Sequence, residues 1–139
     1  MNVSKLKPNQ WRWIVVDDVM LTVGTSGSMP DDDWKKCVED LEAKRVTRWV
    51  GWMLDTFDVN SVQRKLGIDA ILRNKVRLAV LSDDRVVRGL VTAAAWFGVD
   101  VKPFPPKDLP MALKHLNISR PLDTAVTAAF KEIVAEFGY

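Results

Sequence analysis

Residues 76–104 constrain the fold more than any other part of the sequence, because they read as a strand, a helix and a second strand. Short apolar runs occupy Val76 to Leu81 and Val99 to Phe104. Between them, Ser82-Asp83-Asp84 precedes a helical apolar repeat that stops at Gly98, the arrangement of a capped helix with a glycine end. Two parallel neighbouring strands must be connected by a crossover of a dozen or more residues, which is usually a helix, whereas a tight turn can join only antiparallel strands. The segment therefore predicts a helix on a mostly parallel sheet.

The rest of the chain extends this unit into one α/β domain over residues 1–139. We expect a single mixed, mostly parallel sheet with an N-terminal antiparallel hairpin and flanking helices, in the order ββαβαβαβαα. Residues 1–9 are expected to form a flexible N-terminus. The other expected elements are hairpin strands at 11–16 and 19–23, helices at 31–44 and 61–73, a strand at 46–54, a short helix at 109–116 and a C-terminal helix at 119–139.

Composition limits the partners. The 20 basic and 18 acidic residues nearly cancel, so the chain has no strong field for nucleic acid. No run of about 18 apolar residues occurs, and the first residues lack the apolar region of a signal peptide. We therefore expect a cytoplasmic protein that neither binds nucleic acid nor inserts into a membrane.

Few residues could carry catalysis or hold a metal. The chain has one histidine, His115, and one cysteine, Cys37, too few for an ordinary zinc site. The acidic run Asp31 to Asp33 suits a helix start better than a cation site, and the loop Gly24 to Ser28 lacks the lysine of a phosphate-binding loop. We expect Cys37 to be a buried hydrophobe. No catalytic residue, cofactor or metal is predicted, although an enzyme using His115 with Asp or Ser residues stays open as a third option.

Four residues are candidates for contact with a partner. Arg85 and Arg88 lie in the first turns of a predicted helix, where the helix dipole disfavours cations, so they call for an acidic partner or for local pairing. Trp11 and Trp13 share one face of the first strand. They are either buried under the C-terminal helix or exposed as an interface with a protein partner or a second copy in a homodimer.

The order of elements, together with the segment Leu81-Ser82-Asp83-Asp84-Arg85-Val86-Val87-Arg88-Gly89-Leu90-Val91-Thr92, resembles the STAS fold of the anti-sigma-factor antagonists. The chain is most similar to the divergent SpoIIAA-like group of bacterial proteins. The resemblance covers about residues 10–118. It implies a regulatory protein that acts without catalysis.

The same resemblance implies a candidate site at Asn60 and Ser61. Classical antagonists carry an Asp-Ser pair at the start of the helix after the third strand, and a partner kinase phosphorylates the serine. Asn60-Ser61 stands at the matching place, with asparagine in place of the aspartate. A phosphate on Ser61 would be stabilised by the helix N-terminus. The alternative is that Ser61 only caps the helix.

Two functions follow as expectations. The first is a non-enzymatic regulatory or scaffolding module that acts through protein–protein contact, with phosphorylation or an anion at Ser61 as a switch. The alternative is a small-molecule or lipid-binding domain, because some SpoIIAA-like proteins are similar to the CRAL-TRIO lipid-transfer proteins.

Overall fold

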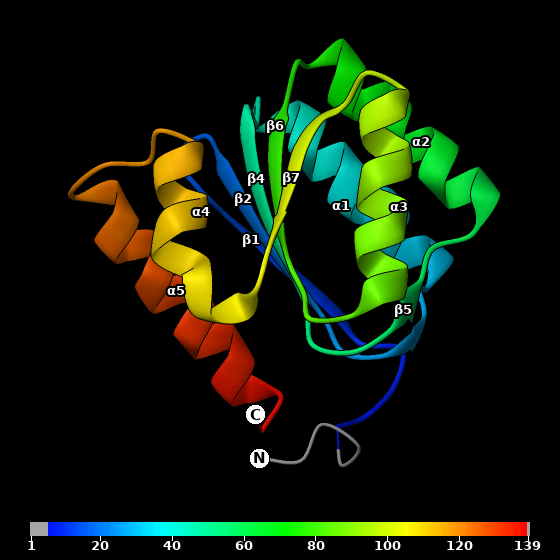
Figure 1. Ribbon diagram of the computed structural model, residues 1–139, viewed down its shortest axis with the longest axis horizontal. Coiled ribbons are helices and arrows are strands. Elements are labelled where there is room, and N and C mark those ends of the chain that lie inside the picture. Colours follow the sequence, from blue (N-terminus) through cyan, green and yellow to red (C-terminus); the bar gives the residue numbers. More distant parts are fainter. Residues whose placement is uncertain (1–5, 139) are drawn as a thin grey trace.

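A five-stranded mixed sheet forms the centre of the computed structural model, which describes residues 6–138 (Figure 1). The strands lie in the order β1 (Trp11–Val16), β2 (Val19–Gly24), β4 (Arg48–Met53), β6 (Arg77–Leu81) and β7 (Asp100–Phe104). β1 and β2 are antiparallel, and the other neighbours are parallel. The predicted fold class is therefore confirmed.

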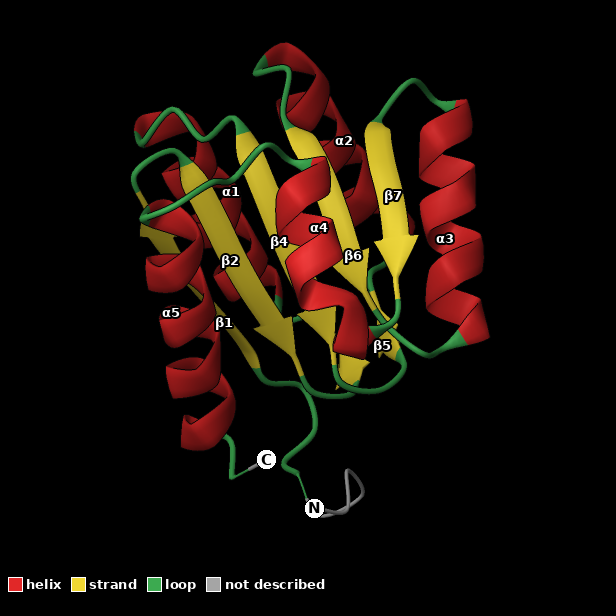
Figure 2. Ribbon diagram, turned by 60° about the vertical axis from the view of Figure 1, so that its left-hand side comes forward, coloured by secondary structure: helices red, strands yellow, loops and turns green. Residues whose placement is uncertain are grey.

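The helices divide between the two faces of the sheet. α1 (Asp31–Ala43), α2 (Ser61–Arg73) and α3 (Arg85–Trp96) cover one face, and α4 (Leu109–His115) and α5 (Leu122–Glu136) cover the other (Figure 1). The parallel strands follow one another across the sheet in a single direction. Since each crossover is right-handed, helices of successive crossovers in one direction fall on the same face. The opposite face is left to the two helices that follow β7 (Figure 2).

Local sequence signals account for most element boundaries. Val16 pairs with Val19, so Asp17 and Asp18 form the two-residue turn, with Asp17 at a φ of 53°. α3 begins after Asp84, whose side chain accepts a hydrogen bond from the Val86 amide at 2.7 Å. Gly98, at a φ of 93°, follows the end of α3, a conformation that glycine adopts without steric cost. The hairpin and this helix lie where the sequence predicted them.

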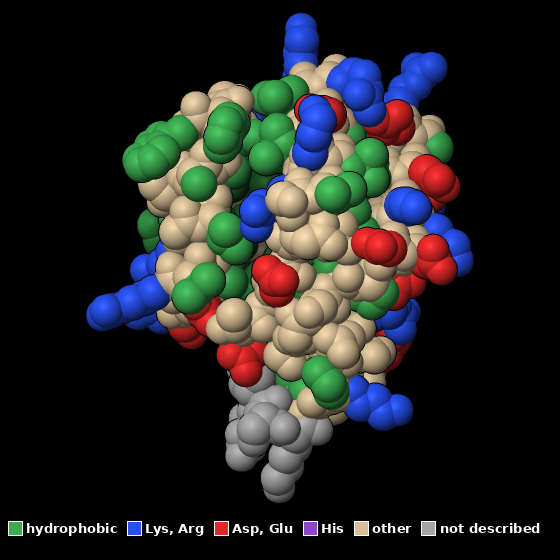
Figure 3. All heavy atoms as spheres, turned by 90° about the vertical axis from the view of Figure 1, so that its right-hand side faces the viewer, with side chains coloured by type: hydrophobic (Ala, Val, Ile, Leu, Met, Phe, Trp, Pro, Cys, Tyr) green, Lys and Arg blue, Asp and Glu red, His purple; other side chains and the backbone are tan. Residues whose placement is uncertain are grey.

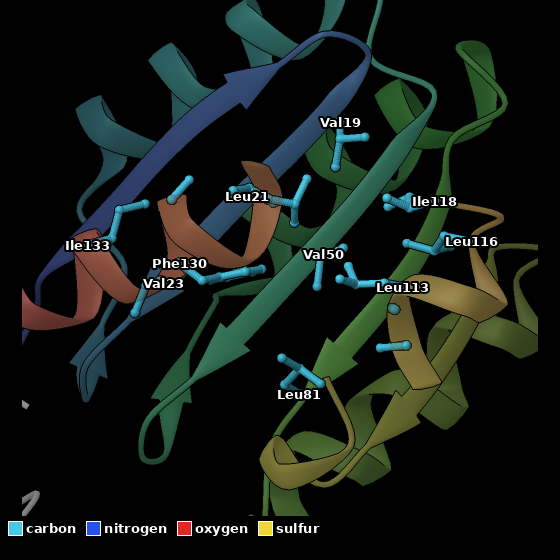
Figure 4. Close-up of a cluster of buried hydrophobic side chains, with 14 of the residues drawn as sticks. Val19, Leu21, Val23, Val50, Leu81, Leu113, Leu116, Ile118, Phe130 and Ile133 are labelled. Atoms are coloured by element: carbon cyan, nitrogen blue, oxygen red, sulfur yellow. The ribbon is translucent and has the colours of Figure 1, made fainter. Parts of the chain in front are cut away.

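The face under α4 and α5 is a continuous apolar core. Alternate residues of β2, Val19, Leu21 and Val23, point into it, because side chains alternate along a strand. Phe130 of α5 is 1% exposed and packs edge-to-face on Trp52, with ring centroids 6.2 Å apart. Figure 4 shows the labelled side chains of β2 and the two helices directed toward one another.

The face under α1 and α2 is packed by tryptophans. Trp34 of α1 lies 5.9 Å from Trp11 and 6.2 Å from Trp49 between ring centroids. Its indole nitrogen donates to the carbonyl of Gln63 at 2.8 Å, which ties α1 to α2. A Cβ on Gly67 would lie 2.5 Å from the Trp34 ring. Gly67 is therefore needed in α2 for this close approach.

Arg48, at the start of β4, joins the β1–β2 turn to the segment that follows α4. Its guanidinium donates to Asp18 Oδ1 at 2.7 Å and to the carbonyl of Asn117 at 3.1 Å. The hydrogen bond from Arg48 is the main reason that the pKa of Asp18 lies below its ordinary value. The pair fixes the β1–β2 turn against the segment between α4 and α5.

Some predicted bounds differ from the structure. Between the predicted elements, two short strands were not expected: β3 (Gly27–Ser28) and β5 (Phe57–Asp58) pair in parallel as a separate two-stranded sheet. A short 3-10 helix, η2 (Pro106–Asp108), precedes α4. The C-terminal helix begins at Leu122, after Pro121, and not at 119.

Residues 6–9, before the first strand, make defined contacts with the rest of the domain. Leu6 is buried, the Asn9 amide donates to the carbonyl of Ser26 at 2.6 Å, and Asn9 Oδ1 accepts from the Ser28 amide at 2.7 Å. These contacts hold residues 6–9 against β3, in contrast with the flexible segment expected over 1–9. Residues 1–5 lie outside the described part of the chain. Among the helices of the described residues, none combines the length and apolar character needed to cross a bilayer.

Candidate functional site

An apolar groove of about 160 Å³ lies between α2 and α3. Its floor is formed by strands β4, β6 and β7, and Figure 3 shows hydrophobic side chains along the hollow between the two helices. The lining residues are Arg64, Gly67, Ile68 and Ile71 of α2, Val87, Leu90, Val91 and Ala94 of α3, Met53, Leu78, Val80 and Val101 of the strands, and Trp34, Phe57 and Val59.

The groove exists because α2 and α3 pack on different neighbours. α2 packs against α1, whereas α3 packs mainly on the edge strand β7. Small residues, Gly67 and Ala94, stand on the two walls, and the space above Gly67 is taken by Trp34. The helices approach at their C-terminal ends, where Leu72 lies 4.0 Å from the position of a Cβ on Gly98. Along the rest of their length, α2 and α3 leave part of the sheet between them uncovered.

Arg64 is the one charged residue in the groove lining, which lies wholly within the described residues. It stands in the first turn of α2, and its Nη1 donates to the carbonyl of Val59 at 2.9 Å. A guanidinium carries five donors, so it can also bind the carboxylate of a ligand. The groove thus combines an apolar body with one cationic group near the N-terminal end of α2.

An acidic hollow adjoins the groove at the carboxyl ends of β4 and β6. Met53 lines both, and Asp55, Asp83 and Asp84 face the hollow. Asp84 accepts hydrogen bonds from the Thr56 hydroxyl and the Val86 amide, and the bond from Thr56 is the main cause that lowers the pKa of Asp84. Across residues 6–138, no cluster of His, Cys, Asp or Glu side chains is arranged to hold a metal ion. Asp84 serves to cap α3.

His115 lies on the opposite face of the sheet from the groove. Its ring packs on Phe104, with centroids 5.7 Å apart. Burial lowers the pKa of His115, and the positive charges of Arg77 and Lys102 lower the pKa further. Its Nε2 is buried and has no hydrogen-bond partner in the structure. These surroundings favour a neutral, packed imidazole.

Cys37 is fully buried in α1. Its Sγ lies 3.7 Å from Sδ of Met20, and burial raises the pKa of the thiol to about 12. A thiol with so high a pKa is a poor nucleophile at neutral pH. The side chain is buried as the sequence predicted.

The two tryptophans predicted as partner contacts are covered by α1, and not by the C-terminal helix. Trp11 is 4% exposed and packs on Trp34 and Phe57. Trp13 is half-buried, and its indole nitrogen donates to Asp40 of α1 at 2.9 Å. The expectation of an exposed Trp11–Trp13 interface is therefore corrected: β2, β4 and the crossover between them place α1 over this face.

Arg85 and Arg88 are both exposed at the start of α3. Arg88 Nε donates to the carbonyl of Ser82 at 3.3 Å, which is a weak contact. Within the described residues, Arg85 makes no hydrogen bond or ion pair. Local pairing with Asp83 and Asp84 is not seen, since Asp84 is engaged with Thr56 and Val86.

Asn60, and not Ser61, caps α2. Asn60 Oδ1 accepts from the Gln63 amide at 2.9 Å, and Gln63 Oε1 accepts from the Asn60 amide at 3.0 Å. This capping box has a signature that the sequence carries, Asn60 followed three residues later by Gln63. Ser61 is the first helical residue and is exposed. The interpretation of Ser61 as the cap is therefore wrong.

The groove was missed by sequence reasoning. Ile68, Ile71, Val87 and Val91 have the spacing of core-facing residues, and helical spacing does not tell whether neighbouring helices meet.

No protein-family model matches the chain, and no curated protein was found to match it.

Proposed function

We propose that the protein is a non-enzymatic binding domain whose groove between α2 and α3 takes a small apolar ligand with an anionic head, such as an aliphatic carboxylate. The observation that carries this proposal is the groove lining, which is aliphatic and aromatic except for Arg64. Apolar walls with one placed charge are typical of ligand sites. Arg64 would bind the head group, since guanidinium–carboxylate bonds are charge-assisted.

The size of the groove limits the ligand. Its volume of about 160 Å³ is close to that of an engineered apolar cavity of about 150 Å³ that binds benzene. A ligand of drug size would need roughly 300 Å³ or more. At about 0.8 kcal/mol for each buried methylene, a chain of about six would contribute ~5 kcal/mol, for a dissociation constant on the order of 0.1 to 1 mM. We therefore expect short chains or single rings.

The groove favours the second of the two functions expected from the sequence. Regulatory contact with a protein partner, the STAS resemblance and the cytoplasmic location stay predictions. Ser61 keeps the regulatory function connected to the site, because it is exposed three residues before Arg64 on α2. A phosphate on Ser61 would lie about one helical turn from the proposed head-group contact and would compete for it.

A nuclear magnetic resonance titration of the full chain with sodium octanoate tests the proposal. We expect saturable amide shifts confined to the groove walls, around Ile68, Ile71 and Ala94. Ala94→Leu should abolish them, because the added atoms fill the groove. Ala95→Leu is the matched control, since Ala95 lies next in α3, is exposed and does not line the groove. Shifts that persist in Ala94→Leu, or that are absent up to several millimolar octanoate, would contradict the proposal.

The head-group contact has its own variant pair. Arg64→Gln should weaken octanoate binding about ten- to hundredfold and leave binding of the uncharged octanol unchanged, because a charge-assisted hydrogen bond contributes on the order of 1.5–3 kcal/mol. Lys65→Gln is the control, since Lys65 is exposed, is adjacent in sequence and pairs with Asp69. An equal loss in both variants would show a general charge effect and would remove Arg64 from the site.

A further inference from the structure

α3 carries a second apolar stripe, on the side that lines neither the groove nor the sheet. Trp96 is 84% exposed, Phe97 72% and Val86 60%. Nothing lies within 4 Å of the position of a Cβ on Gly89, so the helix faces open space there. With Ala93, these residues follow a spacing of three and four along α3, which places them on one strip of the helix surface. We call Val86, Gly89, Ala93, Trp96 and Phe97 the outer stripe.

The outer stripe is symmetric about the middle of the helix. Val86 and Trp96 each stand five residues from Val91, and Gly89 and Ala93 each stand two residues from it. The order is large, small, small, large. An antiparallel copy of α3 would therefore set Val86 against the partner's Trp96, and Gly89 against the partner's Ala93. Small residues at the centre let two helix axes approach to about 8 Å.

The charges of α3 favour the same antiparallel arrangement. Arg85 and Arg88 stand at the positive end of the helix dipole, and the last turn of α3 contains no basic residue. Arg85 has no partner within the described residues. In an antiparallel pair, Arg85 would reach the negative C-terminal end of the other helix and the ring of the partner's Phe97, in a cation–π contact. Each copy would supply to the other the cation that its own helix end lacks.

We propose that two copies of the chain associate through the outer stripe, with their α3 helices antiparallel about a twofold axis at the level of Val91. The arrangement is isologous, so both copies use the same patch. Because one pair of 12-residue helices buries less than a standard interface of about 1,600 Å², we expect a weak dimer, on the order of 10–100 µM. The proposal is independent of the ligand, since no outer-stripe residue lines the groove.

Sedimentation velocity over a range of concentrations to about 1 mM measures the association of the full chain. Trp96→Glu should raise the dimer dissociation constant at least tenfold. Val62→Glu is the matched control, because Val62 is 78% exposed on α2 and lies outside the stripe. A chain that stays monomeric throughout, or an equal loss in both variants, would overturn the proposal.

Gly89→Leu separates association from folding. The monomer has open space for the side chain, and leucine is a better helix former than glycine, so the thermal midpoint should not fall. The dimer should dissociate at least tenfold more readily, because the new side chain separates the helix axes. Unchanged association in this variant would overturn the close antiparallel contact.

Cysteine cross-linking tests the direction of the helices. A mixture of the Gly89→Cys and Ala93→Cys chains should form disulfide-linked heterodimers, since the two positions face each other, and each chain alone should cross-link less. Cys37 is fully buried and does not compete. Equal cross-linking in the single-variant samples would overturn the twofold axis at Val91.

Discussion

The two faces of the sheet are covered to different degrees. Under α4 and α5, Phe130 and Leu116 are at most 1% exposed. On the other face, the side chains between α2 and α3 leave a groove. α2 and α3 are each fixed above the strands that their crossovers connect, whereas α4 and α5 follow the last strand and carry no such constraint. One face is open because of the connectivity of the chain, and not because apolar residues are lacking.

The largest expected effect is on the closed face. Phe130→Ala should lower the free energy of unfolding by about 3–5 kcal/mol, because it removes a ring from a filled core. Leu90→Ala, in the groove wall, should cost less than half as much, since Leu90 is only partly buried and lines an open groove. Urea denaturation measures both. Equal losses would mean that the two faces are packed alike.

An alanine on each face can be enlarged to test how much room the two faces leave. Ala112 of α4 is fully buried, so Ala112→Leu should overpack the closed face and cost about 1–3 kcal/mol. Ala94→Leu adds atoms where the groove has room and should leave the free energy of unfolding unchanged or raise it by up to about 1 kcal/mol. The midpoints of urea denaturation of the two variants, each compared with the unchanged chain, measure the two effects. A loss in Ala94→Leu as large as in Ala112→Leu would argue against an open groove.

Two helix glycines should respond with opposite signs. Gly67→Ala sets a Cβ 2.5 Å from the Trp34 ring and should destabilise by about 1–3 kcal/mol in spite of the helix propensity of alanine. Gly89→Ala meets nothing within 4 Å and should stabilise by about 0.5–1 kcal/mol. Thermal unfolding at a concentration that keeps the chain monomeric measures the pair. The same sign for both would contradict the packing of α2 on Trp34.

The smallest expected effect is the pH dependence from His115 on the closed face. The pKa of His115 lies below its ordinary value of 6.5, so the unfolded chain binds this proton more readily than the folded chain. Stability should therefore fall as the pH is lowered through about 6.5, the ordinary pKa of the group. His115→Leu should flatten the curve of unfolding free energy between pH 7 and pH 5. If the unfolding free energy of His115→Leu depended on pH as steeply as that of the unchanged chain, another titratable group would be responsible.

The lowered pKa of Asp18 acts in a separate range and does not confuse this test. Its stabilising contribution is present above 3.8, the ordinary pKa, and is lost as the pH falls below that value.

Local patterns predicted the elements well where the signal lies within one segment. The helix predicted at 61–73 coincides with α2, although its cap is Asn60 and not Ser61. β3 and β5 were missed, because pairs of two-residue strands have no periodicity to detect. Trp11 and Trp13 were correctly placed on one face, but the covering helix was misassigned. Alternation tells which residues share a face, and only the handedness of the crossovers tells what covers it.

The α/β class, the parallel unit at 76–104 and the hairpin follow from the sequence alone. Caps, turns and periodicity act between residues a few positions apart, so they can be read along the chain. The folded structure was needed to reveal the groove, the burial of Trp11 and the exposure of Trp96. These three features depend on the distances between α1, α2, α3 and the sheet. Crossover geometry and side-chain volume set those distances, so they cannot be predicted from any one segment of the sequence.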